Sequence, residues 1–237
     1  MTLPSPEISE LLSETKFDWL LLDMEHGLLD IQVVQRMIQA VGNRSYCIVR
    51  VPSGEEVWIK RVLETGCDGI LVPHVNNADE ARSIIKMAKY PPQGSRSAGI
   101  ARAQSYGFKF QEYIDTANEN IAVILQIENI YAVRNIESIV SVSGFDAVFI
   151  GPYDLSGSMN KLGKVKDPEV LQAIDEVCNV CFSSGLAVGI FGIDAESVKS
   201  PVKEGFTLIC VGMDTLFLSS SAKNTLNALN NIKNNIK

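Results

Sequence analysis

The chain has 237 residues, 46% of them hydrophobic, which is enough for one large hydrophobic core. Its net charge of −7 and its scattered basic residues argue against nucleic acid and acidic membrane surfaces as partners. No apolar run is long enough to span a membrane, and five cysteines without a signal segment predict a reducing, cytoplasmic location.

Strands and helices alternate along the chain. Ser5-Pro6-Glu7 is typical of a helix start, and this first helix extends to about Thr15. Apolar runs then predict strands over 17–22, 47–51, 69–73, 123–128, 147–150, 187–191 and 208–212. Apolar residues at helical spacing predict helices over 31–41, 55–65, 78–88, 110–118, 130–142, 168–184, 195–204 and 219–236. Two polar segments, 90–110 and 155–165, are predicted to be loops.

Strict alternation with short connections predicts a parallel sheet in a single domain over 1–237. The length and the polar strand ends favour a (β/α)8 TIM-type barrel whose first strand is short or missing, because only four residues precede the first helix. We therefore expect a gap between the strand near 208 and the strand near 17. A doubly wound open sheet is the alternative, although no glycine-rich dinucleotide fingerprint follows the early strands.

Two carboxylates end neighbouring strands of this predicted sheet. Glu128 follows the run at 123–127, and Asp154 follows Gly151-Pro152-Tyr153 at the end of the next strand. In a right-handed βαβ unit these strand ends lie side by side. The pair could hold a divalent cation or divide acid and base roles, or it could simply cap the helices that follow. Gly151 favours a ligand site because it lets the backbone approach an anion closely.

Other strand ends carry Asp23, Glu25, His26, Arg50, His74 and Gln126. Asp23 lies three residues before His26 and could orient its imidazole as a general base. Arg50 ends an apolar strand, so it needs an anion, either a substrate or one of the carboxylates near residue 23. His74 has two interpretations, a functional residue or a cap for the next helix. Arg96 and Arg102 in the long loop give no indication of the substrate.

Several segments in order resemble the HpcH/HpaI aldolase family of metal-dependent pyruvate aldolases. The segments are DWLLLDMEHG at 18–27, VRVP at 49–52, GILVPHVNNADEA at 69–81, YPPQGSRS at 90–97, LQIE at 125–128, FIGPYDLS at 149–156 and VGMD at 211–214. The resemblance implies a barrel that assembles as a homo-oligomer, a hexamer or trimer, with the helix at 219–236 exchanged between subunits. It also implies cleavage or formation of a 4-hydroxy-2-oxo acid, with pyruvate and an aldehyde as partners.

The resemblance also implies roles for individual residues. Glu128 and Asp154 would bind the metal, with Gln126 beside them, and the backbone of Gly151, Pro152, Tyr153 and Asp154 would hold the substrate carboxylate. Arg50 would contact the pyruvyl carbonyl oxygen, and His26 with Asp23 would form the catalytic base.

The chemistry agrees, because a pyruvate enolate needs a Lewis acid or a Schiff base, and no lysine ends a predicted strand. Mg²⁺, Mn²⁺ and Co²⁺ are the expected ions. A related lyase acting on an acyl-CoA or oxaloacetate-type substrate, or a barrel that binds ligand without turnover, are the alternatives.

Overall fold

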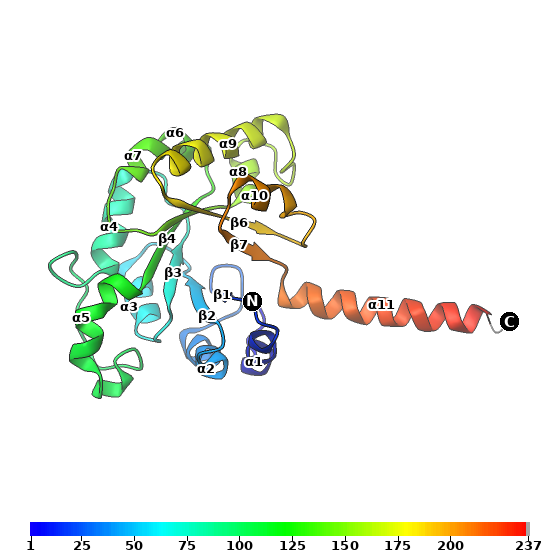
Figure 1. The fold of residues 1–237 in the computed structure, drawn as a ribbon, viewed down its shortest axis with the longest axis horizontal. Coiled ribbons are helices and arrows are strands. Elements are labelled where there is room, and N and C mark those ends of the chain that lie inside the picture. Colours follow the sequence, from blue (N-terminus) through cyan, green and yellow to red (C-terminus); the bar gives the residue numbers. More distant parts are fainter. Residues whose placement is uncertain (236–237) are drawn as a thin grey trace.

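Seven parallel strands form one sheet in the order in which they occur along the chain (Figure 1). A computed structural model describes residues 1–235. The strands are β1 (Trp19–Asp23), β2 (Tyr46–Arg50), β3 (Gly69–Val72), β4 (Ala122–Ile127), β5 (Ala147–Ile150), β6 (Ala187–Gly192) and β7 (Leu208–Val211). This sequential parallel order confirms the predicted α/β TIM-type fold.

Helices cover the outer face of the sheet, except for α11, which extends away from it (Figure 1). The helices are α1 (Pro6–Glu14), α2 (Ile31–Val41), α3 (Glu56–Leu63), α4 (Ala78–Ala88), α5 (Phe110–Asn120), α6 (Ile130–Arg134), α7 (Ile136–Val140), α8 (Pro152–Ser158), α9 (Pro168–Ser183), α10 (Lys199–Glu204) and α11 (Asp214–Asn235), with a short 3₁₀ turn over Ser105–Gly107. Ser5, Asp30 and Asn77 cap their helices with side-chain oxygens that accept backbone N–H groups.

The strands are apolar on both faces because each face packs against a different core. The larger core lies between sheet and helices and includes Leu22, Val49 and Leu125. The smaller core fills the interior of the curved sheet with Ile48, Leu71, Ile124, Ala147 and Phe149. Side chains that alternate along each strand therefore reach opposite cores.

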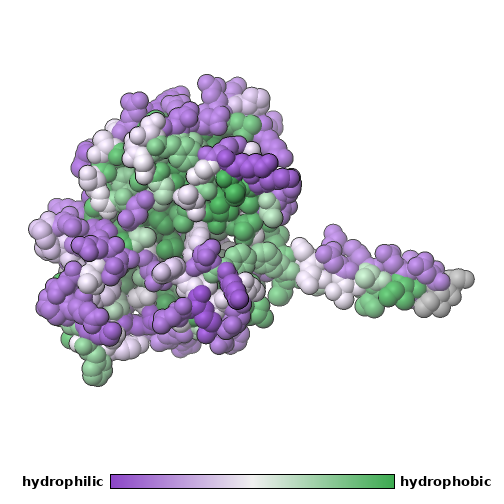
Figure 2. Space-filling model, viewed as in Figure 1, coloured by the Kyte–Doolittle hydropathy of each residue, from purple (hydrophilic) through white to green (hydrophobic). Residues whose placement is uncertain are grey.

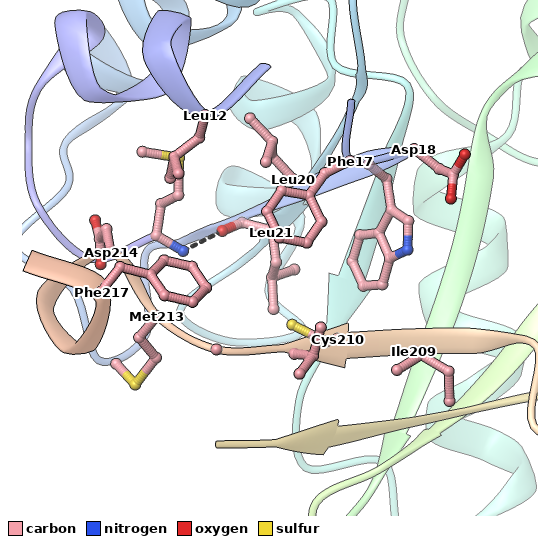
Figure 3. Close-up of a pocket in the computed structure, with 14 residues that line it drawn as sticks. Leu12, Phe17, Asp18, Leu20, Leu21, Ile209, Cys210, Met213, Asp214 and Phe217 are labelled. Carbon is pink, nitrogen blue, oxygen red and sulfur yellow. Dashed lines mark hydrogen bonds between the residues drawn. The ribbon is translucent and has the colours of Figure 1, made fainter. Parts of the chain in front are cut away.

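The sheet does not close between β7 and β1 in the described part of the chain, so the expected gap is present. The backbone of Met1 lies along β1, where its nitrogen donates to the Leu21 carbonyl, the dashed line in Figure 3. Its carbonyl accepts the Asp23 N–H at 3.0 Å. The N–H groups of Thr2 and Leu3 donate instead to the Asp214 carboxylate at 2.8–3.1 Å. A cavity of about 90 Å³ remains at this seam between β1 and β7.

Four predicted elements differ from the structure, one of them only in its start, because α10 begins at Lys199 rather than near 195. The segment 155–165 does not start as a loop, because Pro152–Ser158 forms α8, with proline in its first turn. The predicted helix 130–142 is two short helices that meet at Asn135. The terminal helix starts at Asp214 rather than near 219, and its predicted last residue, 236, lies outside the described residues.

Helix α11 projects away from the body of the molecule (Figure 1). Its outer half carries an apolar patch that is visible in Figure 2, formed by Leu226, Leu229 and Ile232, which are 58–59% exposed. Among the described residues, no helix has the length and apolar character needed to cross a membrane.

Candidate active site

A cavity of about 350 Å³ opens at the carboxyl ends of the strands. All the site residues expected from the sequence line it except Glu128, which lies just behind its wall; the lining ones are Asp23, His26, Arg50, Gln126, Gly151, Pro152, Tyr153 and Asp154. Phe149, Phe191 and Met213 form an apolar part of the wall. Parallel pairing brings these residues together because it aligns the carboxyl ends of all strands at one face.

Arg50 is held between two carboxylates. Asp23 and Arg50 are paired directly across β1 and β2, and the guanidinium donates to both carboxylate oxygens of Asp23 at 2.9 and 2.6 Å. Its Nη1 lies 3.1 Å from Glu25 Oε2. Such a bidentate pair fixes the plane of the guanidinium, so Arg50 presents a rigid positive group beside the cavity.

Asp23 contacts the backbone of His26, which differs from the expected contact with the imidazole. Its Oδ1 accepts the N–H groups of Glu25 at 3.0 Å and His26 at 3.2 Å. Burial acts to raise the pKa of Asp23, but the hydrogen bond and charge of Arg50 outweigh it, so this pKa lies below its ordinary value. Asp23 therefore orders the turn that carries His26, while the His26 ring stays 61% exposed, 3.8 Å from Glu25.

Glu128 is buried at the end of β4 and its carboxylate is surrounded by donors. Oε1 accepts the backbone N–H of His74 at 2.8 Å, and Oε2 accepts the amide of Gln126. Glycine suits position 151, because a Cβ there would make tight contacts of 3.0 Å to the Glu128 Cβ and 3.1 Å to its Oε2. This close approach brings the backbone between β5 and α8 against the carboxylate.

Glu25, His74 and Glu128 form one compact group, called here the Glu–His–Glu group. One ligand atom from each lies within 4.8 Å of the other two, a spacing that could hold a metal ion. Asp154, which is exposed in the first turn of α8, is not part of it. From the sequence, Glu25 was expected only as a possible ion-pair partner of Arg50, a contact that the structure contains. Its place between Asp23 and His26 at a strand end was the available signal for a site role.

Two buried oxygens in or next to this group accept no hydrogen bond among the described residues. They are Glu25 Oε2, which has only the ion-pair contact with Arg50, and Gln126 Oε1. Burial, together with the charge of Glu128, raises the pKa of Glu25 despite the opposing charge of Arg50. Oxygen and imidazole donors with unmet capacity suit a divalent cation, so the residues present fit a metal site.

The arginines of the long loop do not join the cavity. Arg96 is buried over the ring of Tyr90 and pairs with Glu64 at 3.2 Å. Arg102 donates to the carbonyl oxygen of Thr65 at 2.7 Å. Both hold the loop against the end of α3.

A curved parallel sheet with charged groups gathered at its carboxyl ends is the architecture of a (β/α) barrel enzyme. The chain matches the model of the HpcH/HpaI aldolase/citrate lyase family over residues 1–221, and it belongs to this family. The family and its aldolase relatives make it a carbon–carbon lyase.

Aldolases are among the relatives that it resembles. It is 38% identical to a 4-hydroxy-2-oxo-heptane-1,7-dioate aldolase of Escherichia coli, over 93% of this chain and 85% of the relative. It is 33% identical to a hydroxypyruvate/pyruvate aldolase of Roseovarius nubinhibens, over 93% and 87%. A solved structure of a family protein from Burkholderia cenocepacia superposes with a TM-score of 0.93 at 32% identity, covering 97% of this chain and 92% of that one.

Proposed function

We propose that the protein is a metal-dependent aldolase that cleaves or forms a 4-hydroxy-2-oxo acid, with pyruvate and an aldehyde as the other reactants. The observation that carries the proposal is the strand-end cavity lined by Arg50, His26 and Gln126, next to which the Glu–His–Glu group lies through the hydrogen bond between Gln126 and Glu128. Its aldolase relatives supply the reaction class.

Glu128 and Asp154 are the proposed metal ligands, with Gln126 positioning Glu128 through their hydrogen bond. A divalent ion such as Mg²⁺, Mn²⁺ or Co²⁺ supplies positive charge to the oxygens of the 2-oxo acid when it is bound. The first turn of α8 leaves the N–H groups of Tyr153 and Asp154 without intrahelical partners, which suits them to a substrate carboxylate. Pro152 and Gly151 fix this turn at the cavity wall.

Arg50 faces the carbonyl oxygen of the pyruvyl half, where negative charge grows as the carbon–carbon bond breaks. Asp23 keeps the guanidinium in this orientation. His26 accepts the proton of the 4-hydroxyl group, so the oxygen can form the aldehyde carbonyl while the bonding electron pair passes to the pyruvyl half. The exposed His26 ring can then exchange its proton with water.

The most direct test is cleavage after treatment with a chelator. Protein freed of metal should lose aldol cleavage and regain it when Mg²⁺, Mn²⁺ or Co²⁺ is added. A panel of aldehydes offered with pyruvate then identifies the second substrate. Full activity of metal-free protein, or no pyruvate-dependent product with any aldehyde, would contradict the proposal.

A homo-oligomer, a hexamer or trimer, is also proposed, with α11 exchanged between subunits. The support is the apolar patch of Leu226, Leu229 and Ile232, which this chain alone leaves exposed. Light scattering at micromolar concentration should give a multiple of 25.9 kDa, and Leu229→Asp should reduce it. A wild-type monomer would contradict it. The five free cysteines support a cytoplasmic location.

A further inference from the structure

The imidazole of His74 lies between two carboxylates at the end of β3. Its Nδ1 is 3.0 Å from Glu128 Oε1, and its Nε2 is 3.0 Å from Glu25 Oε1. When two atoms bind one ion through bonds of about 2.1 Å at nearly right angles, the two atoms lie about 3.0 Å apart. His74 Nδ1 and Glu128 Oε1 have this separation.

The backbone holds His74 in an uncommon conformation to place it there. Its φ of 60° lies in the left-handed region, which costs energy for a residue other than glycine and is concentrated at functional sites. The helix-capping interpretation of His74 is wrong, because Asn77 caps α4 by accepting the Glu80 N–H at 2.9 Å. The backbone N–H of His74 donates to Glu128 instead, which fixes the ring beside that carboxylate.

An excess of negative charge and buried oxygens that accept no hydrogen bond both favour a cation at this group. Asp23, Glu25 and Glu128 face one guanidinium, that of Arg50, so negative charge exceeds positive charge in a largely buried space. The side chain of Glu25 is only 10% exposed, and its Oε2 accepts no hydrogen bond among the described residues, although it lies 3.1 Å from Arg50 Nη1. Gln126 is 2% exposed, its Oε1 also has none, and its amide contacts Glu128.

We propose that His74 binds through Nδ1 to the same divalent ion as Glu128, and that Glu25 orients the imidazole by accepting its Nε2–H. A carboxylate behind a metal-bound histidine fixes its tautomer and orientation. This inference rests on the proposed metal-dependent function and adds a nitrogen donor to it. An imidazole ligand favours Co²⁺ and Mn²⁺ over Mg²⁺, which prefers oxygen ligands alone.

The two histidines of the chain provide a matched pair of variants. Asparagine tolerates a positive φ, so His74→Asn keeps the backbone conformation while it removes the nitrogen donor. His26→Asn removes the other imidazole near the same cavity. The full-length chain, freed of metal, is loaded with Mn²⁺ and studied by pulsed electron paramagnetic resonance, which detects nitrogen bound to the ion.

We expect nitrogen coupling in the wild type and in His26→Asn, and none in His74→Asn. The ratio of Co²⁺ to Mg²⁺ affinity should fall on the order of 10–100-fold in His74→Asn and stay constant in His26→Asn. Glu25→Gln should keep the coupling while Co²⁺ affinity falls about tenfold. Unchanged Co²⁺ affinity in Glu25→Gln would overturn the positioning role of Glu25.

The wild-type spectrum alone tests the central claim, even if His74→Asn fails to fold. Mn²⁺ bound only by oxygen in a protein with metal-dependent aldol cleavage would overturn the role of His74 and leave the proposed function standing. Nitrogen coupling that persists in His74→Asn would also overturn it. A wild type that binds neither Mn²⁺ nor Co²⁺ would overturn both proposals.

Discussion

The two edges of β1 have contrasting surroundings. On one side β1 pairs with β2 in register, so the side chains of Asp23 and Arg50 meet in a bidentate ion pair. On the other side β1 faces β7 across the seam cavity, where Met1 and the Asp214 carboxylate satisfy part of the backbone instead of a strand (Figure 3). The comparison indicates that the Asp23–Arg50 geometry depends on the β1–β2 register, whereas on the seam side Met1 and Met213 line the site cavity without a paired strand.

The largest loss of activity should come from a change at Glu128, which directly follows β4 and lies far from the seam between β1 and β7. Glu128→Gln should lose about 10⁴-fold in aldol turnover and lose Mn²⁺ binding, because the charge that holds the ion is gone. Glu137→Gln, on the exposed face of α7, is the control and should behave as wild type. Normal turnover in Glu128→Gln would separate the site from metal chemistry altogether.

His26 follows β1 and lies closer to the seam. A substitution of His26 tests whether the turn after β1 takes part in proton transfer. His26→Ala should lower turnover by about 10²–10⁴-fold, as expected for a lost acid–base group, with metal affinity unchanged. Its side chain is 61% exposed, so the free energy of unfolding should also be unchanged. Turnover equal to wild type would assign His26 a structural role.

The Asp23–Arg50 pair should dominate stability on the paired edge of β1. Asp23→Asn leaves Arg50 with less compensation and should lower the free energy of unfolding by about 3 kcal/mol at pH 7. Because the folded-state pKa of Asp23 lies below 3.8, its contribution is present above that pH and is lost as pH falls through the folded-state value. Denaturant unfolding of the wild type and of Asp23→Asn at pH 7 and below pH 3.8 should show that the difference in free energy of unfolding is smaller at the lower pH. The exposed control Asp18→Asn should show no such difference at either pH, and a pH-independent gap in Asp23→Asn would contradict the assignment.

The smallest effect is expected at the seam. Asp214→Asn weakens the bonds to the Thr2 and Leu3 N–H groups and should lower the free energy of unfolding by about 1–2 kcal/mol. Hydrogen exchange at these two amides should accelerate, while metal affinity stays as in wild type. Asp175→Asn, on the exposed side of α9, is the control. Loss of metal binding in Asp214→Asn would show that the seam and the site are coupled.

Local sequence determined most of the elements. Apolar runs bounded by glycine and proline placed the strands, because a strand buried on both faces needs apolar side chains at every position. Helical periodicity gave Ile31–Val41 and Ala78–Ala88 with their observed bounds. The gap expected between the strands near 208 and 17 is present, since β7 and β1 do not pair in the described part of the chain.

Tertiary structure alone decided which polar groups meet. Glu25 and His74 lie far apart in the sequence. The curvature of the sheet brings the ends of β1 and β3 close together, so that Glu25 Oε1 lies 3.0 Å from His74 Nε2. The β1–β2 register places Asp23 against Arg50 rather than against the His26 ring. The packing of Met1 and Asp214 determines the seam cavity. Periodicity records which face of an element is buried, but partners across strands follow from register and curvature, which no local pattern specifies.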